Sequence, residues 1–281
     1  YSVSEEIFYT EKDLVNGKSP EGKDVDRVSE KNYFFKMSKY QNQLVKHIEE
    51  NPSFIQPESR KNEVLGFLKK GLNDLCISRP KKRLSWGVEL PFDRDYVTYV
   101  WFDALLNYAT GVGYLQEERD DFFQKWWCQA GAHHIIGKDI LTTHAVYWTT
   151  MLLALGLPLP KTIFAHGWIL NRDSEKMSKS KGEVINPLDF KDIVGVDGLR
   201  YFFVRDIHFG NDAPISQDLV FNRLNAELAN NLGNLLSRTA NLINKYFDGK
   251  APRGWHDDES TQQLITTAKS AAEKVKKDIV N

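Results

Sequence analysis

The chain has 281 residues, of which 41% are hydrophobic, 27% charged and 12% aromatic, and its formal net charge is −1. These values are typical of a globular protein with a substantial core and about two domains. They exclude a general positive field for nucleic acid, so any such contact must come from local patches.

Cysteine use and hydropathy indicate the compartment. The chain contains two cysteines, Cys76 and Cys128. So few cysteines favour a reducing compartment, and two cannot form an all-cysteine metal site. The longest apolar run, Met151–Leu157, is far too short to span a bilayer, and no signal peptide is recognisable. We therefore expect a cytoplasmic protein without membrane contact.

The first quarter of the chain divides into a turn-rich part and two helical stretches. Residues 1–30 contain turn-forming pairs such as the one ending at Gly17, and they predict a small irregular hairpin or knuckle. Between residues 32 and 71, apolar residues recur at helical spacing in two stretches. Pro52 and Pro57 lie between these stretches and are expected to separate the two helices.

From about residue 84 the pattern alternates between strand and helix. Tyr96–Trp101 is a β-rich run and is followed by a helical stretch from Ala104. His133–Ile136 and Thr162–His166 are predicted strands, and Asp139–Leu155 between them is a predicted long apolar helix. This rhythm is typical of βαβ units that form a parallel sheet.

Ligands of parallel sheets bind at the carboxyl ends of the strands, where Trp101, Gly137 and His166 are predicted to lie. Gly137 permits close approach of a ligand to the backbone, and Asp139 is predicted as the N-cap of the following helix. Free N–H groups at such a helix start attract anions, and an Asp there can accept hydrogen bonds from ribose hydroxyls. An ordinary capped turn, with His144 in a structural role, is the alternative.

A second set of residues predicts an apolar slot. Trp101 is expected to end a strand, while Ala104 and Tyr108 lie four residues apart on one face of the following helix. Aromatic rings beside a small residue form a slot that suits a thioether, because sulfur makes favourable contacts with aromatic rings. Core packing is the alternative explanation.

The segment Lys176–Ser180 is an unusual combination of residues. It places two ammonium groups three residues apart among small hydroxyl residues, which suits a mobile loop that closes over a polyphosphate. Lysine fits this role because it is a compact point charge on a flexible stem. A solvated Lys/Ser surface loop is the alternative.

Beyond about Ser216 the pattern is purely helical and predicts the start of an α-helical bundle. The apolar stripe consists of Val220, Leu224, Leu228, Leu232, Leu235 and Leu242. Asn230, Asn234 and Arg238 lie at i, i+4 and i+8, and therefore share one helix face. Amides and a guanidinium can bind the edges of single-stranded bases, although a solvated helix face is the alternative.

Taken together, these segments resemble the methionyl-tRNA synthetase family of class I aminoacyl-tRNA synthetases. Lys176–Ser180 matches the second signature of that class, and the resemblance covers essentially the whole chain. The other similar stretches are Glu30–Phe35, Ile77–Arg79, Tyr99–Tyr108, Ile136–Ile140 with His144, and His166–Trp168. Leucyl, isoleucyl and valyl enzymes share the second signature, but they carry a large editing insertion for which the connective stretch here is too short.

The resemblance implies an α/β fold class. We expect the second half of a class I Rossmann-type nucleotide-binding fold with a connective segment, followed by an α-helical anticodon-binding bundle. The expected regions are a connective segment (1–83), the second half of the catalytic domain (84–165), a stem-contact region with the lysine loop (166–215) and the start of the anticodon-binding domain (216–281).

The resemblance also implies an ATP-dependent ligation of L-methionine to its tRNA, through a methionyl-adenylate, with Mg²⁺ accompanying ATP. Lys176, Ser178 and Lys179 would act on the triphosphate and leaving pyrophosphate, with Lys179 as the main residue, and Arg79 would orient the substrate. The ATP-binding set is Gly137, Asp139, His166, Gly167, Trp168, Ile169 and Lys179. The methionine-binding set is Trp101, Ala104, Tyr108, Ile140 and His144. The set that reads the tRNA(Met) anticodon is Asn230, Asn234 and Arg238.

The chain departs from the family at two points. The first (HIGH-type) signature is absent, so we expect the N-terminal catalytic half outside this chain, on the same or a separate polypeptide, and little activity without it. The connective knuckle often binds zinc through cysteines, but Ser2, Glu5, Ser19 and Gly22 occupy the matching positions. Zinc needs Cys or His ligands there, so we predict no metal in this knuckle.

Two other functions remain open at this point. The synthetase itself is the favoured function, and the missing first signature is the reason to consider a non-catalytic tRNA-binding or assembly module derived from a synthetase. The lysine loop alone is also compatible with a different nucleotidyl transferase that acts on a small substrate. A strand followed by a HIGH-type motif in the sequence upstream of residue 1 would count against the first alternative. A large loss of tRNA charging in Asn234→Ala would reject the second.

Overall fold

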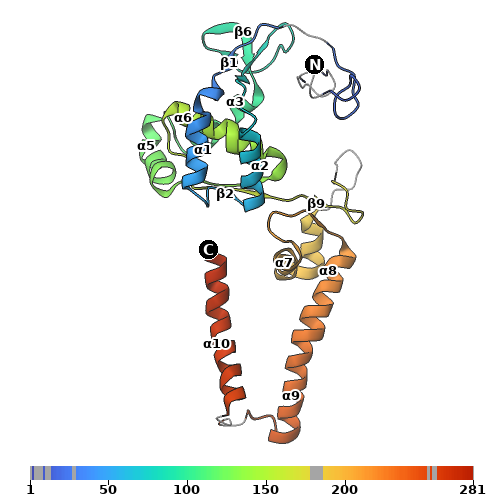
Figure 1. Cartoon of the computed structure of the whole chain (residues 1–281). Helices are drawn as coiled ribbons and strands as arrows, with labels where there is room; N and C mark the ends of the chain where they lie inside the picture. Colours follow the sequence, from blue (N-terminus) through green and yellow to red (C-terminus); the bar gives the residue numbers. More distant parts are fainter. Residues whose placement is uncertain are drawn as a thin grey trace. The chain divides into compact units, whose positions relative to one another are not determined.

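The computed structural model of the chain describes residues 2, 9, 14–26, 30–177, 186–251, 254 and 258–280. The chain forms two compact units (Figure 1). The first unit comprises Tyr1–Trp168 and His208–Asp212, and the second comprises Ile169–Ile207 and Ala213–Asn281. The short segment His208–Asp212 therefore returns to the first unit between two stretches of the second.

The first unit begins its helical part with the two helices that the apolar spacing predicts. They are α1 (Gln41–Glu50) and α2 (Glu58–Leu68), and a 3₁₀ turn, η1 (Met37–Tyr40), precedes α1. Their apolar faces are buried in the first core, whose central members are Leu44, Ile48, Phe54, Ile55, Val64, Leu68, Ile136 and Ile163. The predicted turn at Gly17 is also present, with a short antiparallel bridge between Val15 and Lys18.

A three-stranded parallel sheet lies against this core. The sheet has the order β2 (Ile55–Gln56), β8 (Thr162–His166), β7 (His133–Gly137), and all neighbours run parallel. The predictions for β7 and β8 are confirmed. Strand β2 is a finding that the sequence pattern did not indicate, because only two residues between prolines take part in it.

The β-rich run before Trp101 does not belong to this sheet, so that part of the predicted βαβ alternation is wrong. Strand β6 (Asp93–Thr98) pairs antiparallel with β4 (Ser78–Pro80) and β5 (Glu89–Leu90). Nearby, β1 (Phe34–Phe35) pairs antiparallel with β3 (Leu75–Cys76). A β-rich composition specifies an extended backbone but not its partners, which is why the alternation misled the prediction.

Short helical segments connect β6 to β7 and pack around a second core. They are α3 (Val100–Ala104), α4 (Asn107–Thr110), η2 (Glu117–Arg119), α5 (Asp120–Phe123) and the π-helix η3 (Gln124–Ala130). The second core contains Leu105, Ala109, Phe123, Trp127, Trp148, Met151 and Leu152.

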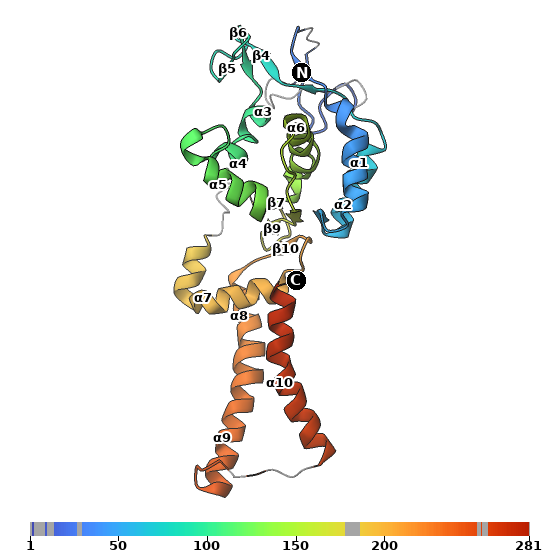
Figure 2. The same cartoon turned by 90° about the vertical axis from the view of Figure 1, so that its left-hand side faces the viewer.

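The predicted long helix after β7 is confirmed as one helical run from residue 138 to residue 155. It consists of the 3₁₀ turn η4 (Lys138–Ile140), the π-helix η5 (Thr143–Trp148) and α6 (Thr149–Leu155). Figure 2 shows α6 beside α1. The run contributes Leu141, Ala145 and Val146 to the first core.

The second unit is mainly helical. It contains β9 (Ile169–Leu170), which pairs parallel with β10 (Ala213–Pro214), and α7 (Pro187–Asp206), which bends at Gly195 where φ is +74°. The remaining helices are α8 (Gln217–Arg223), the π-helix η7 (Leu224–Gly233), α9 (Asn234–Phe247) and α10 (Glu259–Val280). The third core consists of Phe190, Leu199, Phe202, Ile215 and Val220.

The apolar stripe of this helical part is buried only at its beginning. Val220 is fully buried, whereas Leu232, Leu235 and Leu242 are 56–65% exposed. Within the described ranges, none of the helices combines the length and apolar character that crossing a bilayer requires.

Candidate functional site

The centre of the candidate site is a hydrogen-bonded pair formed by Tyr108 on α4 and His144 on η5. The Tyr108 hydroxyl lies 2.9 Å from Nε2 of His144, and Nδ1 of His144 lies 2.9 Å from the carbonyl oxygen of Ile140. A carbonyl can only accept, so Nδ1 carries the proton, and Nε2 of the neutral ring accepts the bond from the tyrosine hydroxyl. Both ring nitrogens are therefore engaged, which fixes the orientation of the imidazole.

Burial keeps this pair neutral. His144 is almost completely buried, and burial lowers its pKa, while the bond to the carbonyl of Ile140 opposes that effect. Burial also raises the pKa of Tyr108. The pair thus presents a neutral surface of mixed aromatic and polar character over the physiological pH range.

His134 and Trp148 extend the pair into an aromatic cluster, which we define as Trp101, Tyr108, His134, His144 and Trp148. The indole nitrogen of Trp148 donates to Nε2 of His134 at 3.1 Å, and the Tyr108 and His134 rings lie 4.5 Å apart. Burial is the main reason that the pKa of His134 falls to about 4, and repulsion from His144 and His133 adds to the effect. The neutral ring fits its contact with Trp148, because the indole can only donate and requires an unprotonated Nε2.

The sequence prediction missed both His134 and Trp148. Alternate residues of β7 face the core: His134 and Ile136 are buried, while His133 and Ile135 are exposed. The sequence does not alternate between polar and apolar residues here, so it carries no signal for the burial of His134.

The other predicted methionine-binding residues surround this pair, although Trp101 is not at a strand end as predicted. Strand β6 ends at Thr98, and the N–H groups of Phe102 and Asp103 bond to the carbonyl of Tyr99, which starts α3 early. Trp101 is therefore helical, and its ring lies 6.5 Å edge-on from His144. Half-buried Ala104 ends α3.

Ile140 is the remaining predicted methionine-binding residue, and it belongs to a different core from Trp101 and Tyr108. It packs against the first core, whereas Trp101 and Tyr108 pack against the second. The structure thus brings together Trp101, Tyr108, Ile140 and His144 where the two cores of the first unit meet, with Ala104 on the same helix as Trp101.

The predicted nucleotide-binding residues of the first unit follow two adjacent parallel strands. Gly137 and His166 are direct register partners at the ends of β7 and β8. A Cβ atom at Gly137 would collide with the carboxylate of Asp139, and one at Gly167 would collide with the backbone of Asn211. The backbone clash makes glycine necessary at position 167, whereas at position 137 the Asp139 side chain can move aside.

One detail of that prediction is wrong, because Asp139 is not an N-cap. It lies within the 3₁₀ turn η4, whose N-cap position is Gly137, and no side chain caps this turn. His166 is exposed, and its Nδ1 donates to the carbonyl of Gly167 at 2.8 Å. Trp168 is half-buried.

Arg79 lies in β4, in the antiparallel sheet. Its guanidinium donates to the carbonyl of Ser78 at 2.8 Å and to Sγ of Cys76 at 3.3 Å, and it stacks 4.8 Å from the centre of the Tyr99 ring. These contacts hold the side chain in a defined orientation. Both cysteines of the chain are free.

The remaining predicted residues for ATP belong to the second unit. Ile169 lies in β9, and Lys176 is exposed and pairs antiparallel with Leu170. The next residue, Met177, packs against the third core. Ser178 and Lys179 lie outside the described residues.

Asn230, Asn234 and Arg238 are exposed on the helical run of the second unit. Asn230 is in the π-helix η7, and the other two are in α9. A π-helix has i→i+5 hydrogen bonds and a wider turn than an α-helix, so residues four apart lie nearly above one another. This geometry is compatible with the predicted common face.

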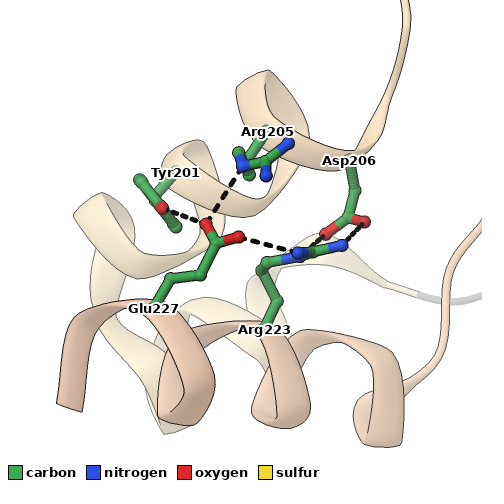
Figure 3. A network of polar contacts seen from close by, with 5 residues as sticks. All are labelled: Tyr201, Arg205, Asp206, Arg223 and Glu227. Carbon is green, nitrogen blue, oxygen red and sulfur yellow. Dashed lines mark hydrogen bonds and ion pairs between the residues drawn. The ribbon is translucent and has the colours of Figure 1, made fainter. Parts of the chain in front are cut away.

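A polar network anchors the start of this helical run to α7, as Figure 3 shows. Arg223 binds both carboxylate oxygens of Asp206 at 2.7 and 2.8 Å, and it also reaches Glu227 at 2.8 Å. Glu227 further accepts from Arg205 at 3.0 Å and from the hydroxyl of Tyr201. The bond from Tyr201 is the main reason that the pKa of Glu227 is lowered.

The positions matched to zinc ligands offer no thiol or imidazole. Ser2 and Ser19 are buried, and Ser19 accepts a hydrogen bond from the N–H of Lys23. Gly22 adopts a left-handed conformation, and Glu5 lies outside the described residues. Among the residues that the structure describes, no group of three or more His, Cys, Asp or Glu side chains could hold a metal ion.

Comparison with known proteins identifies related sequences over nearly the whole chain. The family model described as "tRNA synthetases class I (M)" matches residues 5–240. The methionine–tRNA ligase of Caldanaerobacter subterraneus subsp. tengcongensis is 48% identical over 276 residues, which are 98% of this chain and 42% of the relative. That of Bacillus subtilis is 48% identical over 263 residues, which are 89% of this chain and 39% of the relative.

Solved structures give the same result. Mycobacterium tuberculosis methionyl-tRNA synthetase bound by methionyl-adenylate superposes with a TM-score of 0.80 at 40% identity, covering 99% of this chain and 55% of that one. The predicted α/β fold class and the family resemblance are thus confirmed. The chain spans about 42% of the length of the first of these curated relatives.

Proposed function

Because the chain belongs to the family of class I (M) tRNA synthetases, we propose that the protein ligates L-methionine to tRNA(Met). The carboxylate of methionine attacks the α-phosphate of ATP, which gives methionyl-adenylate and pyrophosphate. A hydroxyl of the terminal ribose of the tRNA then attacks the methionyl carbonyl of the adenylate, which transfers the methionyl group and releases AMP. The observation that carries this proposal is the family match over residues 5–240. The proposal concerns the whole protein, including the first half of the nucleotide-binding fold.

The aromatic cluster supports methionine as the amino acid. A neutral His144 with both ring nitrogens engaged has no donor to offer a polar side chain, and Tyr108 already donates to it. Trp101, Ala104 and Ile140 supply the apolar surface. A thioether gains from aromatic edges, whereas a charged side chain would have to be desolvated against them.

ATP would be held mainly by backbone and charge. In the proposal, Gly137 and Asp139 hold the ribose, and His166, Gly167, Trp168 and Ile169 hold the adenine. Lys176, Ser178 and Lys179 act on the triphosphate together with its Mg²⁺, and Lys179 stabilises the leaving pyrophosphate. Phosphoryl chemistry of this kind depends mostly on positioning and electrostatic stabilisation.

Arg79 would orient the substrate. Its stacking on Tyr99 and its bond to the carbonyl of Ser78 restrain the guanidinium, so the group loses little freedom when an anion binds. A carboxylate is the natural partner for such a group.

The second unit would recognise the tRNA. Asn230, Asn234 and Arg238 are exposed, so their amide and guanidinium groups are accessible to unstacked anticodon bases. We place this reaction in the cytoplasm, a reducing compartment that two free cysteines fit. The knuckle is expected to bind no zinc.

Methionine-dependent exchange of radioactive pyrophosphate into ATP tests the first step on the full-length protein. We expect exchange with methionine and little with leucine, followed by charging of tRNA(Met). Absence of exchange, or equal exchange with leucine, would refute the proposed function.

A further inference from the structure

Asp212 links the two predicted ATP-binding segments of the first unit. One carboxylate oxygen accepts from Nζ of Lys138 at 2.7 Å, and the other accepts from the backbone N–H of Trp168 at 2.9 Å. Lys138 also lies 4.3 Å from the centre of the Trp168 ring. Lys138 follows β7 and Trp168 follows β8, so one carboxylate connects the loops after two adjacent strands.

The segment that carries this carboxylate is itself anchored in the first unit. The ring of Phe209 packs edge-on against Phe164 of β8 at 5.2 Å, and Arg60 donates to the carbonyl of Gly210 at 3.3 Å. The backbone of Asn211 lies directly against Gly167, where a Cβ atom would not fit. These contacts give Asp212 a fixed position relative to both loops.

The link between Lys138 and Asp212 joins one positive and one negative side chain. The side chains of Lys138 and Asp212 are 22% and 32% exposed, so solvent screens the pair only in part. The hydrogen bond from Lys138, followed by that from the Trp168 N–H, lowers the pKa of Asp212 and keeps it ionised. Replacement by Asn preserves the shape of the side chain and removes its charge.

We propose that Asp212 is a positioning residue for ATP, which sets the spacing between the Gly137–Asp139 and His166–Trp168 segments. This inference rests on the proposed function, because those two segments bind the ribose and the adenine only in that proposal. The aromatic cluster takes no part in the link. The effect of Asp212 should therefore fall on ATP and not on methionine.

Steady-state pyrophosphate exchange on the full-length protein tests the inference through the separate KM values for ATP and methionine. For Asp212→Asn we expect the KM for ATP to rise about tenfold, since Asn has no charge and offers one acceptor oxygen in place of two to the donors of the two loops. The KM for methionine should stay within about twofold. Lys138→Met leaves the bond to Trp168 intact, and should raise the KM for ATP by about threefold.

A double variant separates positioning from general damage. If Lys138 affects ATP binding only through Asp212, then the double variant Asp212→Asn, Lys138→Met should have the same KM for ATP as Asp212→Asn alone. Asp24→Asn is the matched control, because Asp24 forms an exposed ion pair with Lys18 at 3.0 Å in the same unit. It should leave both KM values unchanged.

The outcomes distinguish the inference from the function. An active parent whose Asp212→Asn variant keeps its KM for ATP, or raises both KM values equally, overturns the inference alone. A parent without methionine-dependent exchange overturns the proposed function and the inference together. If Asp212→Asn does not fold, Lys138→Met decides, and an unchanged KM for ATP in that variant overturns the inference.

Discussion

The aromatic cluster of the first unit and the Asn230, Asn234 and Arg238 face of the second unit differ in how their polar atoms are held. In the cluster, Tyr108, His144, His134 and Trp148 bind one another or a backbone carbonyl, and His144 is almost completely buried. The helix face presents its groups to solvent. In the proposed function, the difference means that the methionine site is organised before its ligand binds, whereas the anticodon face gains its order from the ligand.

The largest expected effect follows from removing the centre of the buried cluster. His144→Ala leaves a cavity and deprives the Tyr108 hydroxyl and the Ile140 carbonyl of their partner, so we expect a loss of about 4 kcal/mol in the free energy of unfolding. Urea denaturation measures it. A loss below about 1 kcal/mol would contradict the view that this site is preorganised by burial.

The next effect concerns pH. The pKa of His134 is lowered from 6.5 to about 4, so the unfolded state binds more protons than the folded state between these values. Stability should be complete above pH 6.5, fall as the pH decreases, and level off near pH 4, with a total loss of up to about 3 kcal/mol.

Denaturation at a series of pH values on the parent and on His134→Gln measures this contribution. The variant should have a smaller slope than the parent, because only the share of His134 is removed and His144 and His47, whose pKa values burial also lowers, keep theirs. His133→Gln, at the exposed neighbouring position, should keep the slope of the parent. An identical slope in parent and His134→Gln would exclude the buried neutral imidazole as its source.

The exposed face should respond in function and not in stability. Arg238→Ala is expected to lower kcat/KM for tRNA charging by about tenfold to a hundredfold, because a charge-assisted contact contributes about 1.5–3 kcal/mol. Its free energy of unfolding should change by less than about 0.5 kcal/mol. Charging and denaturation assays on one preparation measure both, and a destabilised variant would show that Arg238 has a structural role.

The smallest effect concerns the start of the helical run. The Ser216 hydroxyl caps α8 by accepting from the N–H of Leu219 at 3.2 Å. Ser216→Ala should cost about 1 kcal/mol of stability in the second unit. Hydrogen exchange of the amides in α8 measures it, and unchanged protection would show that the Arg223 and Glu227 network alone holds the helix.

Much of the scaffold could be predicted from the sequence, because apolar spacing specifies α1, α2, β7, β8 and the run from residue 138 to residue 155. The pairing of β6 could not, since composition does not specify which strands meet. Strand β2 is too short to produce a pattern.

For the site, the family resemblance puts Tyr108 and His144 in one set, and in the structure a hydrogen bond joins them. The predictions missed His134, because the two histidines and two isoleucines of β7 have no apolar alternation that separates the buried face from the exposed one. They also missed Asp212, because its contacts with Lys138 and Trp168 span 74 and 44 residues and have no local signature. Such contacts are specified only by the tertiary fold.

The central claim is that the aromatic cluster serves the activation of methionine, whereas the Asn230, Asn234 and Arg238 face serves only the charging of tRNA. One paired assay tests this claim most directly. Pyrophosphate exchange and tRNA charging are measured together on full-length His144→Ala and Asn234→Ala. We predict that His144→Ala lowers both activities by at least about tenfold, and that Asn234→Ala lowers charging while exchange stays within about twofold. Equal losses of exchange in the two variants, or unchanged charging in Asn234→Ala, would contradict the claim.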